Sequence, residues 1–288
     1  MLAFGLAQRP EEEGTVRKLL LLACSMFVVG TVLPAFGAPP QGDDKWALII
    51  GVDHHQGRTR SNVGAVGDAN AFHTLLSANG WREDRIRMLT DSGATQAAIR
   101  QGLQWIVDNC GPESQCVVHY SGHTKQMNNA GGSEGLHEYL WPHDNRFISD
   151  TEFADYMRRL RGYSWIDISA CEAAGFDDGI SSPRRLFTAA SQEHEKGYED
   201  PSWRQSVWTG LLVERAMFRG QADSNGDGHV SLAEALPWAI EQAPRYSTGQ
   251  SHGPQHPYRA GGEETDFFAP QAPAATPPKQ CILLIICL

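Results

Sequence analysis

The stretch Ser164–Glu172 (SWIDISACE) is a short apolar run of strand type that ends on a cysteine, Cys171. A second run, Cys116–His123 (CVVHYSGH), ends in the same way on a histidine. Two adjacent parallel strands with these ends would place a thiol beside an imidazole at the carboxyl edge of a sheet, where open α/β sheets carry their sites. The alternative interpretation is a buried cysteine and a core histidine in two unrelated strands.

The rest of the chain alternates between strand-like and helix-like patterns. Apolar runs predict strands, and apolar residues at helical spacing predict helices between them. The polar, Gly-rich segments 124–146 and 172–184 are predicted to be loops. This alternation favours a mostly parallel sheet covered by helices on both faces. The expected strands are 45–52, 85–89, 116–123, 164–171 and 185–190, and the expected helices are 63–78, 95–109, 149–161, 207–219 and 232–243.

Composition places few limits on fold but excludes one class of partner. The 288 residues suffice for one large or two small domains with a real core. Hydrophobic residues make up 41% and charged residues 20%, as in an ordinary globular protein. The formal net charge of −10 argues against nucleic acid as a partner, because phosphate binding needs a basic face.

The N-terminus has the three parts of a secretory signal peptide. Arg17 and Lys18 precede an apolar run, and small residues follow Pro34. We therefore predict a signal peptide over 1–38 and a secreted or periplasmic protein. The acidic residues 11–13 do not suit such a segment, and a true start near Val16 would account for them. A retained membrane anchor is the alternative.

The C-terminal segment 270–288 is rich in Pro and Ala and is predicted to be disordered. Its last eight residues are apolar but too few to span a bilayer, so no stable membrane span is expected after signal removal.

The six cysteines differ in their expected roles. Cys24 lies within the predicted signal peptide. Cys110 and Cys116 flank a short Gly-Pro loop and could pair in an oxidising compartment. Cys171 is left without an evident partner, as a nucleophilic thiol would need.

Residues 223–234 (DSNGDGHVSLAE) fit the twelve-residue calcium loop of an EF-hand. Oxygen donors occupy loop positions 1, 3, 5, 9 and 12, and glycine occupies position 6. The position-7 residue would contribute only its backbone carbonyl. The predicted Ca²⁺ ligands are Asp223, Asn225, Asp227, His229, Ser231 and Glu234. The alternative is an Asp/Asn/Gly turn that binds no ion.

Several short segments, taken together and in order, resemble the caspase-like clan of cysteine peptidases. The resemblance is closest to metacaspases and their bacterial relatives, and it covers about residues 45–195. Cys171-Glu172-Ala-Ala-Gly175 looks more like the legumain side of the clan. The matching pieces are Ala47–Val52, Gly64–Ala69, Tyr120–His123, Glu138–Asp144, Ile148–Glu152 and Thr188–Ser191.

This resemblance implies a three-layer α/β/α caspase-haemoglobinase fold with a mostly parallel central sheet, here over 39–269. It also implies hydrolysis of peptide bonds in a peptide or protein substrate. Cys171 would be the nucleophile and His123 the general base and acid. Backbone amides of Cys171 and of the residues just after His123 would form the oxyanion hole.

The chain departs from the metacaspase pattern at two positions. Thr124 follows His123 where metacaspases usually have Gly, and Ser169 stands where they have an Asp that helps to bind a basic P1 side chain. Asp68 and Ser121 match the other pocket positions, so Asp68, Ser121 and Ser169 are the predicted substrate-binding residues. Asp167 would share a strand face with Ser169 and either substitutes for the lost acid or is a structural partner.

A calcium site of this family uses carboxylates in the loops after the two central strands. Glu138, Asp150 and Asp178 have corresponding spacings. The alternative, solvated loop carboxylates, is the preferred interpretation.

Three hypotheses follow. The first is an exported cysteine endopeptidase, calcium-dependent and specific for a basic P1 residue. The second, favoured by Thr124 and Ser169, is a catalytically inactive homologue that acts as a calcium-stabilised binding module. The third is a plain calcium-stabilised structural domain.

Overall fold

The computed structural model describes residues 43–128 and 136–263, together with Thr265 and Phe268. All of these described residues belong to one compact unit. The predicted signal peptide over 1–38 and the predicted disordered tail over 270–288 lie outside the described residues. Both remain predictions.

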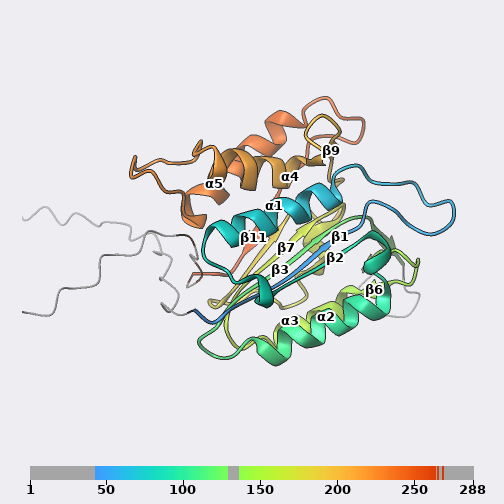
Figure 1. The fold of residues 1–288 in the computed structure, drawn as a ribbon. Coiled ribbons are helices and arrows are strands. Elements are labelled where there is room, and N and C mark those ends of the chain that lie inside the picture. The colour runs from blue at the N-terminus through green and yellow to red at the C-terminus, as the bar shows by residue number, and fades with distance from the viewer. Residues whose placement is uncertain (1–42, 129–135, 264, 266–267, 269–288) are drawn as a thin grey trace, which may run out of the picture. The chain divides into compact units, whose positions relative to one another are not determined.

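A six-stranded sheet forms the centre of the fold (Figure 1), in the order β11-β8-β7-β3-β1-β2. Five of its strands are parallel, and β11 pairs antiparallel with β8 at one edge. The prediction of a mostly parallel sheet is therefore confirmed. Its strands are β1 (Lys45–Gly51), β2 (Ile86–Thr90), β3 (Gln115–Ser121), β7 (Tyr163–Ser169), β8 (Arg185–Ala189) and β11 (Tyr258–Ala260).

Helices cover both faces of this sheet, which gives three layers (Figure 1). Alternate residues of a strand point to opposite faces. Accordingly Ala47 and Ile49 belong to one core cluster, while Leu48 and Ile50 belong to the other. The first core packs against α1 (Ala65–Ala78), α4 (Val207–Thr209) with its continuation, and α5 (Leu232–Tyr246); the second packs against α2 (Gln96–Asn109) and α3 (Asp150–Arg158).

Several helices begin directly after a residue whose side chain caps the first turn. Thr95, Ser149 and Ser231 each accept a hydrogen bond from a backbone amide three residues further on. Such N-caps satisfy a donor that the first helical turn would otherwise leave unpaired. Ser231 and Glu234 form a full capping box, so the last residue of the predicted calcium loop also fixes the start of α5.

The predicted loop over 124–146 is corrected by the structure. Much of it forms a small antiparallel sheet with the order β4-β5-β6. Its strands are short and largely polar, so they lack the apolar run by which a strand is recognised in sequence. Buried Leu140 and Ile148 hold this sheet to the core. Its strands are β4 (Thr124–Met127), β5 (His137–Leu140) and β6 (Ile148–Ser149).

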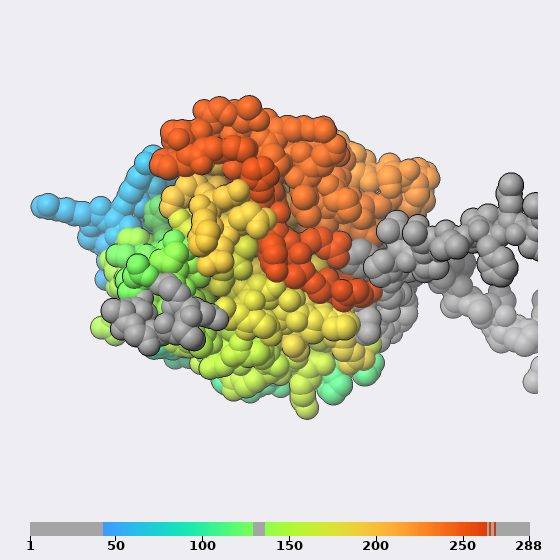
Figure 2. Space-filling model, turned by 180° about the vertical axis from the view of Figure 1, so that it is seen from behind, coloured from blue at the N-terminus to red at the C-terminus, as the bar shows by residue number. Residues whose placement is uncertain are grey.

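Three further segments complete the description. The helix expected over 207–219 is α-helical only over its first turn and continues as a π-helix, η4 (Gly210–Phe218). The C-terminal segment (red in Figure 2) lies beside the yellow segment that contains β8, where β11 extends the sheet. The short elements are η1 (Glu83–Arg85), η2 (Asp91–Gly93), η3 (Ala173–Phe176), β9 (Glu199–Asp200) and β10 (Gln205–Ser206).

Asp167, one candidate for the missing pocket acid, lies in the protein core. Its Oδ2 is 2.9 Å from Nδ1 of His119, directly opposite on β3, and both side chains are fully buried. Its Oδ1 accepts hydrogen bonds from Thr188 Oγ1 at 2.6 Å and Trp208 Nε1 at 2.8 Å. A buried carboxylate needs such partners, so the structure supports the structural role for Asp167.

Cys110 and Cys116 form a disulfide at the end of α2 and the start of β3. Both residues are fully buried. Among the described residues, Cys171 is the free cysteine. The pairing considered from the sequence is therefore present, and it leaves Cys171 with a free thiol.

Candidate active site

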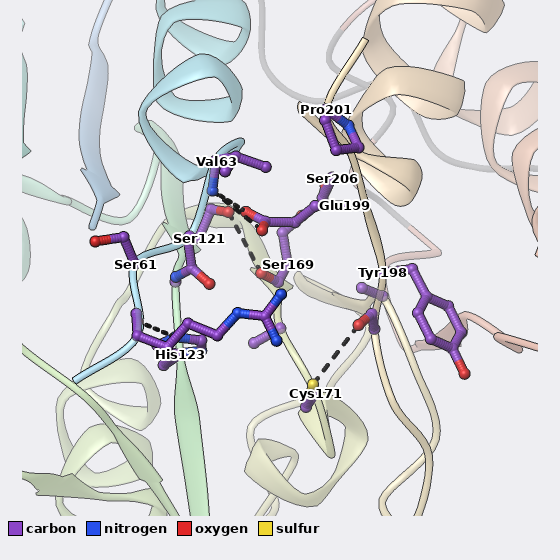
Figure 3. A pocket seen from close by; sticks show the side chains of 16 residues that line it. Ser61, Val63, Ser121, His123, Ser169, Cys171, Tyr198, Glu199, Pro201 and Ser206 are labelled. Carbon is purple, nitrogen blue, oxygen red and sulfur yellow. Dashed lines mark hydrogen bonds between the residues drawn. The ribbon is translucent and has the colours of Figure 1, made fainter. Parts of the chain in front are cut away.

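His123 and Cys171 line one cavity of about 370 Å³. They follow β3 and β7, which are neighbouring parallel strands, so both side chains lie at the carboxyl edge of the sheet on one cavity (Figure 3). The chain turns sharply after the thiol, because Glu172 has a left-handed backbone with φ of 48°. Glu172 also forms an ion pair with Lys196. The structure thus brings together the two residues predicted to be catalytic.

The imidazole of His123 is oriented by a backbone carbonyl. Its Nε2 lies 2.8 Å from the carbonyl oxygen of Arg60. A carbonyl only accepts hydrogen bonds, so Nε2 carries the proton and Nδ1 of the neutral ring keeps its lone pair. The ring also stacks on His55, with centroids 5.3 Å apart, and lies near Trp141. His123 is therefore held as a base whose free nitrogen is Nδ1.

The Cys171 thiol is protonated in the resting arrangement. Sγ donates a hydrogen bond to the carbonyl oxygen of Gly197 at 3.6 Å, as Figure 3 shows. Burial raises the pKa of the thiol, and the neighbouring Glu172 charge raises it further. The thiol and the imidazole do not hydrogen-bond to each other. Catalytic contacts are often loose in ligand-free enzymes and tighten when substrate binds.

Thr124, the residue in place of the usual glycine, contacts the other catalytic loop. Its hydroxyl donates to the carbonyl oxygen of Cys171 at 2.7 Å. Thr124 also begins β4, opposite Leu140 of β5. The threonine therefore ties the segment after His123 to the segment that carries the nucleophile.

The three predicted substrate-binding residues occupy different depths. Ser121 and Ser169 line the cavity. Asp68 does not, because it lies fully buried behind Ser121, whose hydroxyl donates to Asp68 Oδ2 at 2.7 Å. The backbone amide of Ser206 donates to Asp68 Oδ1 at 2.9 Å. Burial is the main cause that raises the pKa of Asp68 to about 7.

Ser169, where the relatives carry an acid, has a polar partner in this chain. Its hydroxyl lies 2.9 Å from that of Thr209 in α4. A hydroxyl pair of this kind carries no charge, so Ser169 does not restore the missing pocket carboxylate.

Glu199 of β9 was missed by sequence reasoning. It is the only carboxylate among the described residues that line the cavity. A single Glu in a polar segment carries no periodic or motif signal, so only the fold reveals its position. The strand pair β9–β10 places it opposite Ser206, whose amide binds Asp68.

A second cavity, of about 380 Å³, collects the other carboxylates considered from the sequence. Glu138, Asp150 and Asp178 line it, and so do Asp177 and Glu193. Glu138 and Asp150 are buried, and burial is the main cause that raises the pKa of Glu138. Across the described ranges, however, no three acidic, His or Cys side chains converge closely enough to hold one metal ion.

The predicted calcium loop joins η4 to α5. Gly228, at position 6, has φ of 82°, a left-handed conformation that suits glycine. Asp223 accepts the amides of Gly226 and Gly228, while Asp227 accepts that of His229. Glu234 accepts hydrogen bonds from the hydroxyls of Ser224 and Ser231. The loop carries oxygen donors of the kind that Ca²⁺ prefers, but in this structure its carboxylates bind the loop's own amides and hydroxyls and do not converge on one point.

Comparison with known proteins shows a resemblance to one family. The model of the metacaspase peptidase C14 domain matches residues 45–170, which include His123 and end one residue before Cys171. The sequence and structure matches support a caspase-like metacaspase family for this chain. The metacaspase relatives include Metacaspase-2 of Arabidopsis thaliana, 32% identical over 241 residues, which are 69% of this chain and 57% of that protein.

Other metacaspases match over shorter stretches. Metacaspase-3 of Arabidopsis thaliana is 34% identical over 54% of each chain. Metacaspase-1 of Saccharomyces cerevisiae is 32% identical over 38% of this chain and 28% of its own length. The chain thus spans between about a quarter and somewhat more than half of these curated relatives.

Solved structures agree on the caspase-like architecture. The Drosophila initiator caspase Dronc has a TM-score of 0.57 at 12% identity, over 92% of this chain and 95% of that chain. A structure from Geobacter sulfurreducens also has a TM-score of 0.57, at 14% identity, over 75% of this chain and 93% of its own. These likenesses confirm the predicted α/β fold class.

Proposed function

We propose that this metacaspase-like chain is a cysteine endopeptidase that hydrolyses peptide bonds, with Cys171 as nucleophile and His123 as general base and acid. One observation carries the proposal. A free thiol and an imidazole whose unprotonated nitrogen has no hydrogen-bond partner in the described chain line the same cavity at the ends of adjacent strands. The family of the matched domain supports the same chemistry.

The geometry suggests how the reaction proceeds. Nδ1 of His123 takes the proton of Sγ, and the sulfur attacks the scissile carbonyl carbon to form a C–S bond and an oxyanion. Backbone amides beside Cys171 and after His123 stabilise that oxyanion. The C–N bond then breaks as Nδ1–H protonates the leaving amine. A water molecule, deprotonated by His123, finally hydrolyses the thioester and frees Cys171.

The proposed substrate has a basic P1 residue. Asp68 and Ser121 occupy pocket positions that match the metacaspase pattern, and they are hydrogen-bonded to each other at the cavity wall. Asp68 lies behind that wall and would act on a cationic side chain through Ser121 and through its charge.

A peptide electrophile with arginine at P1, such as an acyloxymethyl ketone, tests the proposed nucleophile. We expect one covalent adduct, at Cys171, located by peptide mass spectrometry. Labelling should quicken as the pH rises from 6 to 9, because the raised pKa of Cys171 keeps the thiolate scarce at neutral pH. Prior treatment with a small alkylating reagent should abolish it. Labelling spread over several cysteines, or none at all, would contradict the proposal.

An inactive homologue that binds peptides is the second candidate. It is favoured by the raised pKa of the thiol and by its hydrogen bond to Gly197 rather than to His123. Such a protein would bind the peptide part of the electrophile without forming the adduct. A reversible complex without a covalent product therefore distinguishes the two functions.

Calcium is the proposed cofactor. The chemistry of the 223–234 loop supports this proposal, because its donors are oxygens and Gly228 supplies the turn at position 6. Side-chain oxygens of Asp223, Asn225, Asp227, Ser231 and Glu234 and the carbonyl of His229 would hold it. Bound Ca²⁺ would stiffen the connection from η4 to α5 and thereby stabilise the helical layer on that face of the sheet.

Calcium should raise the melting temperature of the protein, because a ligand that binds only the folded state stabilises it by about 2.7 kcal/mol at a concentration 100 times Kd. Glu234→Gln is expected to remove most of the shift measured between Ca²⁺ and chelator. Glu241→Gln, on the same helix but outside the loop, is the matched control and should keep it. A shift that survives in E234Q but is lost in E138Q would assign calcium to the carboxylate cavity instead. No shift in the unmodified protein would exclude both sites.

Export is proposed as well. It rests on the signal-peptide pattern over 1–38 and is supported by the buried Cys110–Cys116 disulfide, since such bonds persist in oxidising compartments. Within the described part of the chain, no helix combines the length and apolar character needed to cross a membrane.

A further inference from the structure

The two positions at which metacaspases carry pocket acids, here Asp68 and Ser169, place no carboxylate on the wall of the cavity beside Cys171. Ser169 replaces one acid by a hydroxyl that pairs with Thr209. Asp68 is retained but lies fully buried behind Ser121. A cationic P1 side chain that enters the cavity would therefore reach hydroxyls and no carboxylate at these two positions.

Glu199 places a carboxylate on the cavity wall itself. Its Oε1 accepts the backbone amide of Gly64 at 2.8 Å, and both of its oxygens lie 3.1 Å from the amide of Val63. In Figure 3, the Glu199 side chain reaches toward Val63 near Ser121, and Cys171 lies at the other end of the cavity. Its backbone partners thus fix the carboxylate on the wall of the cavity that also contains the thiol.

A purely structural role, as the cap of helix α1, leaves part of this carboxylate unexplained. An ionised carboxylate has about four acceptor positions. Glu199 accepts hydrogen bonds from two backbone amides, those of Val63 and Gly64, and the Val63 amide is shared between the two carboxylate oxygens of Glu199. Acceptor capacity therefore remains on the side that lines the cavity, mostly at Oε2.

Among the described residues, the charged groups at the cavity are one cation, Arg60, and two acids, Glu199 on the wall and Asp68 behind it. Burial is the main cause that raises the pKa of Glu199, and the positive charge of Arg60, which lines the same cavity, partly opposes this shift. Asp68 is close enough that the Glu199 charge raises the pKa of Asp68. A guanidinium or ammonium group placed between Ser121 and Glu199 would relieve this repulsion between the two acids. The volume of about 370 Å³ is within the range of small-molecule sites, roughly 300–1,000 Å³.

We infer that Glu199 is the carboxylate that binds the basic P1 side chain directly, in place of the acid that Ser169 lacks. The inference rests on the proposed peptidase function and assigns a specificity residue to it. Asp68 then acts from behind Ser121 as a second, more distant charge. A guanidinium can donate to Oε2 of Glu199 while the helix cap at Val63 and Gly64 stays intact.

Glu199→Gln separates charge from capping, because its amide oxygen still accepts a backbone N–H. We expect kcat/KM for a peptide with Arg at P1 to fall by at least about 30-fold, the lower end of the loss when one partner of a desolvated charge pair is removed. The value for the same peptide with norleucine at P1 should change less than about threefold. The melting temperature should stay close to that of the unmodified protein.

Asp200→Asn is the matched control. It removes the same charge from the next residue, whose carboxylate binds Ser202 and Tyr246 and does not line the cavity. D200N should keep the Arg-to-norleucine ratio. An equal loss for both peptides in E199Q, or an unchanged ratio, would show that Glu199 only caps α1 and would overturn the inference. Absence of hydrolysis and of Cys171 labelling in the unmodified protein would instead refute the proposed peptidase function.

Discussion

Replacing Cys171 by alanine is expected to lower peptide hydrolysis by at least about three orders of magnitude, as loss of the nucleophile does in other covalent hydrolases. The Cys171 thiol makes one hydrogen bond, to Gly197, and part of it is exposed to the cavity. Its removal therefore costs little packing. The free energy of unfolding should therefore change by less than about 1 kcal/mol. Cleavage of a P1-arginine peptide and denaturant unfolding measure the two effects.

His123→Ala should cause a loss of similar size, and the double variant should be little worse than either single variant. Residues that act as one catalytic unit are non-additive, because each is useful only when the other is present. Multiplicative losses would indicate that the two side chains act independently. Residual cleavage at the unmodified rate in C171A would show that another group performs the chemistry.

The parts of the fold that sequence reasoning predicted correctly share one property. Strands β1, β3 and β7 are buried on both faces and therefore appear as continuous apolar runs. Adjacent parallel pairing then follows from the alternation with helices, and it brings the ends of β3 and β7 together. The proximity of His123 and Cys171 was predictable for that reason.

The rest depended on contacts between segments far apart in the chain. Glu199 reaches the cavity because the two-residue strand β9 pairs with β10. No sequence pattern predicts so short a strand. The face of Asp167 was predictable, but its partner His119 on the neighbouring strand fixes it in the core. Burial of Asp68 behind Ser121 likewise depends on β10, which supplies the amide of Ser206.

Asp68→Asn is expected to stabilise the protein at alkaline pH while weakening its selectivity. Burial raises the pKa of Asp68 from an ordinary value of 3.8 to about 7. At a pH between 3.8 and about 7, the carboxyl of Asp68 is ionised in the unfolded chain and still protonated in the folded chain. Stability therefore falls as the pH rises toward about 7 and stays low above it, with a total cost of about 4 kcal/mol at 1.36 kcal/mol per pKa unit.

Asparagine reproduces the protonated side chain. Its oxygen can accept the amide of Ser206, and its amino group can donate to the hydroxyl of Ser121, as the proton of the neutral acid would. Because the asparagine does not titrate, D68N should gain about 3 kcal/mol on the unmodified protein between pH 5 and pH 8. Urea unfolding at several pH values measures this difference. A difference that does not vary with pH would show that Asp68 is ionised throughout.

The same substitution tests what the buried acid does for substrate binding. Peptides with arginine and norleucine at P1 are cleaved by the same catalytic groups, so the ratio of their kcat/KM values cancels the pH dependence of the chemical step. In the unmodified protein this ratio should rise as the pH passes through about 7, because ionised Asp68 adds negative charge behind Ser121. In D68N it should rise less or not at all, whereas in E199Q a rise should remain from a lower starting value. An unaltered pH profile in D68N would mean that Asp68 supports the cavity wall only. A lost profile together with raised stability would show that an unfavourable buried charge is kept because substrate recognition uses it.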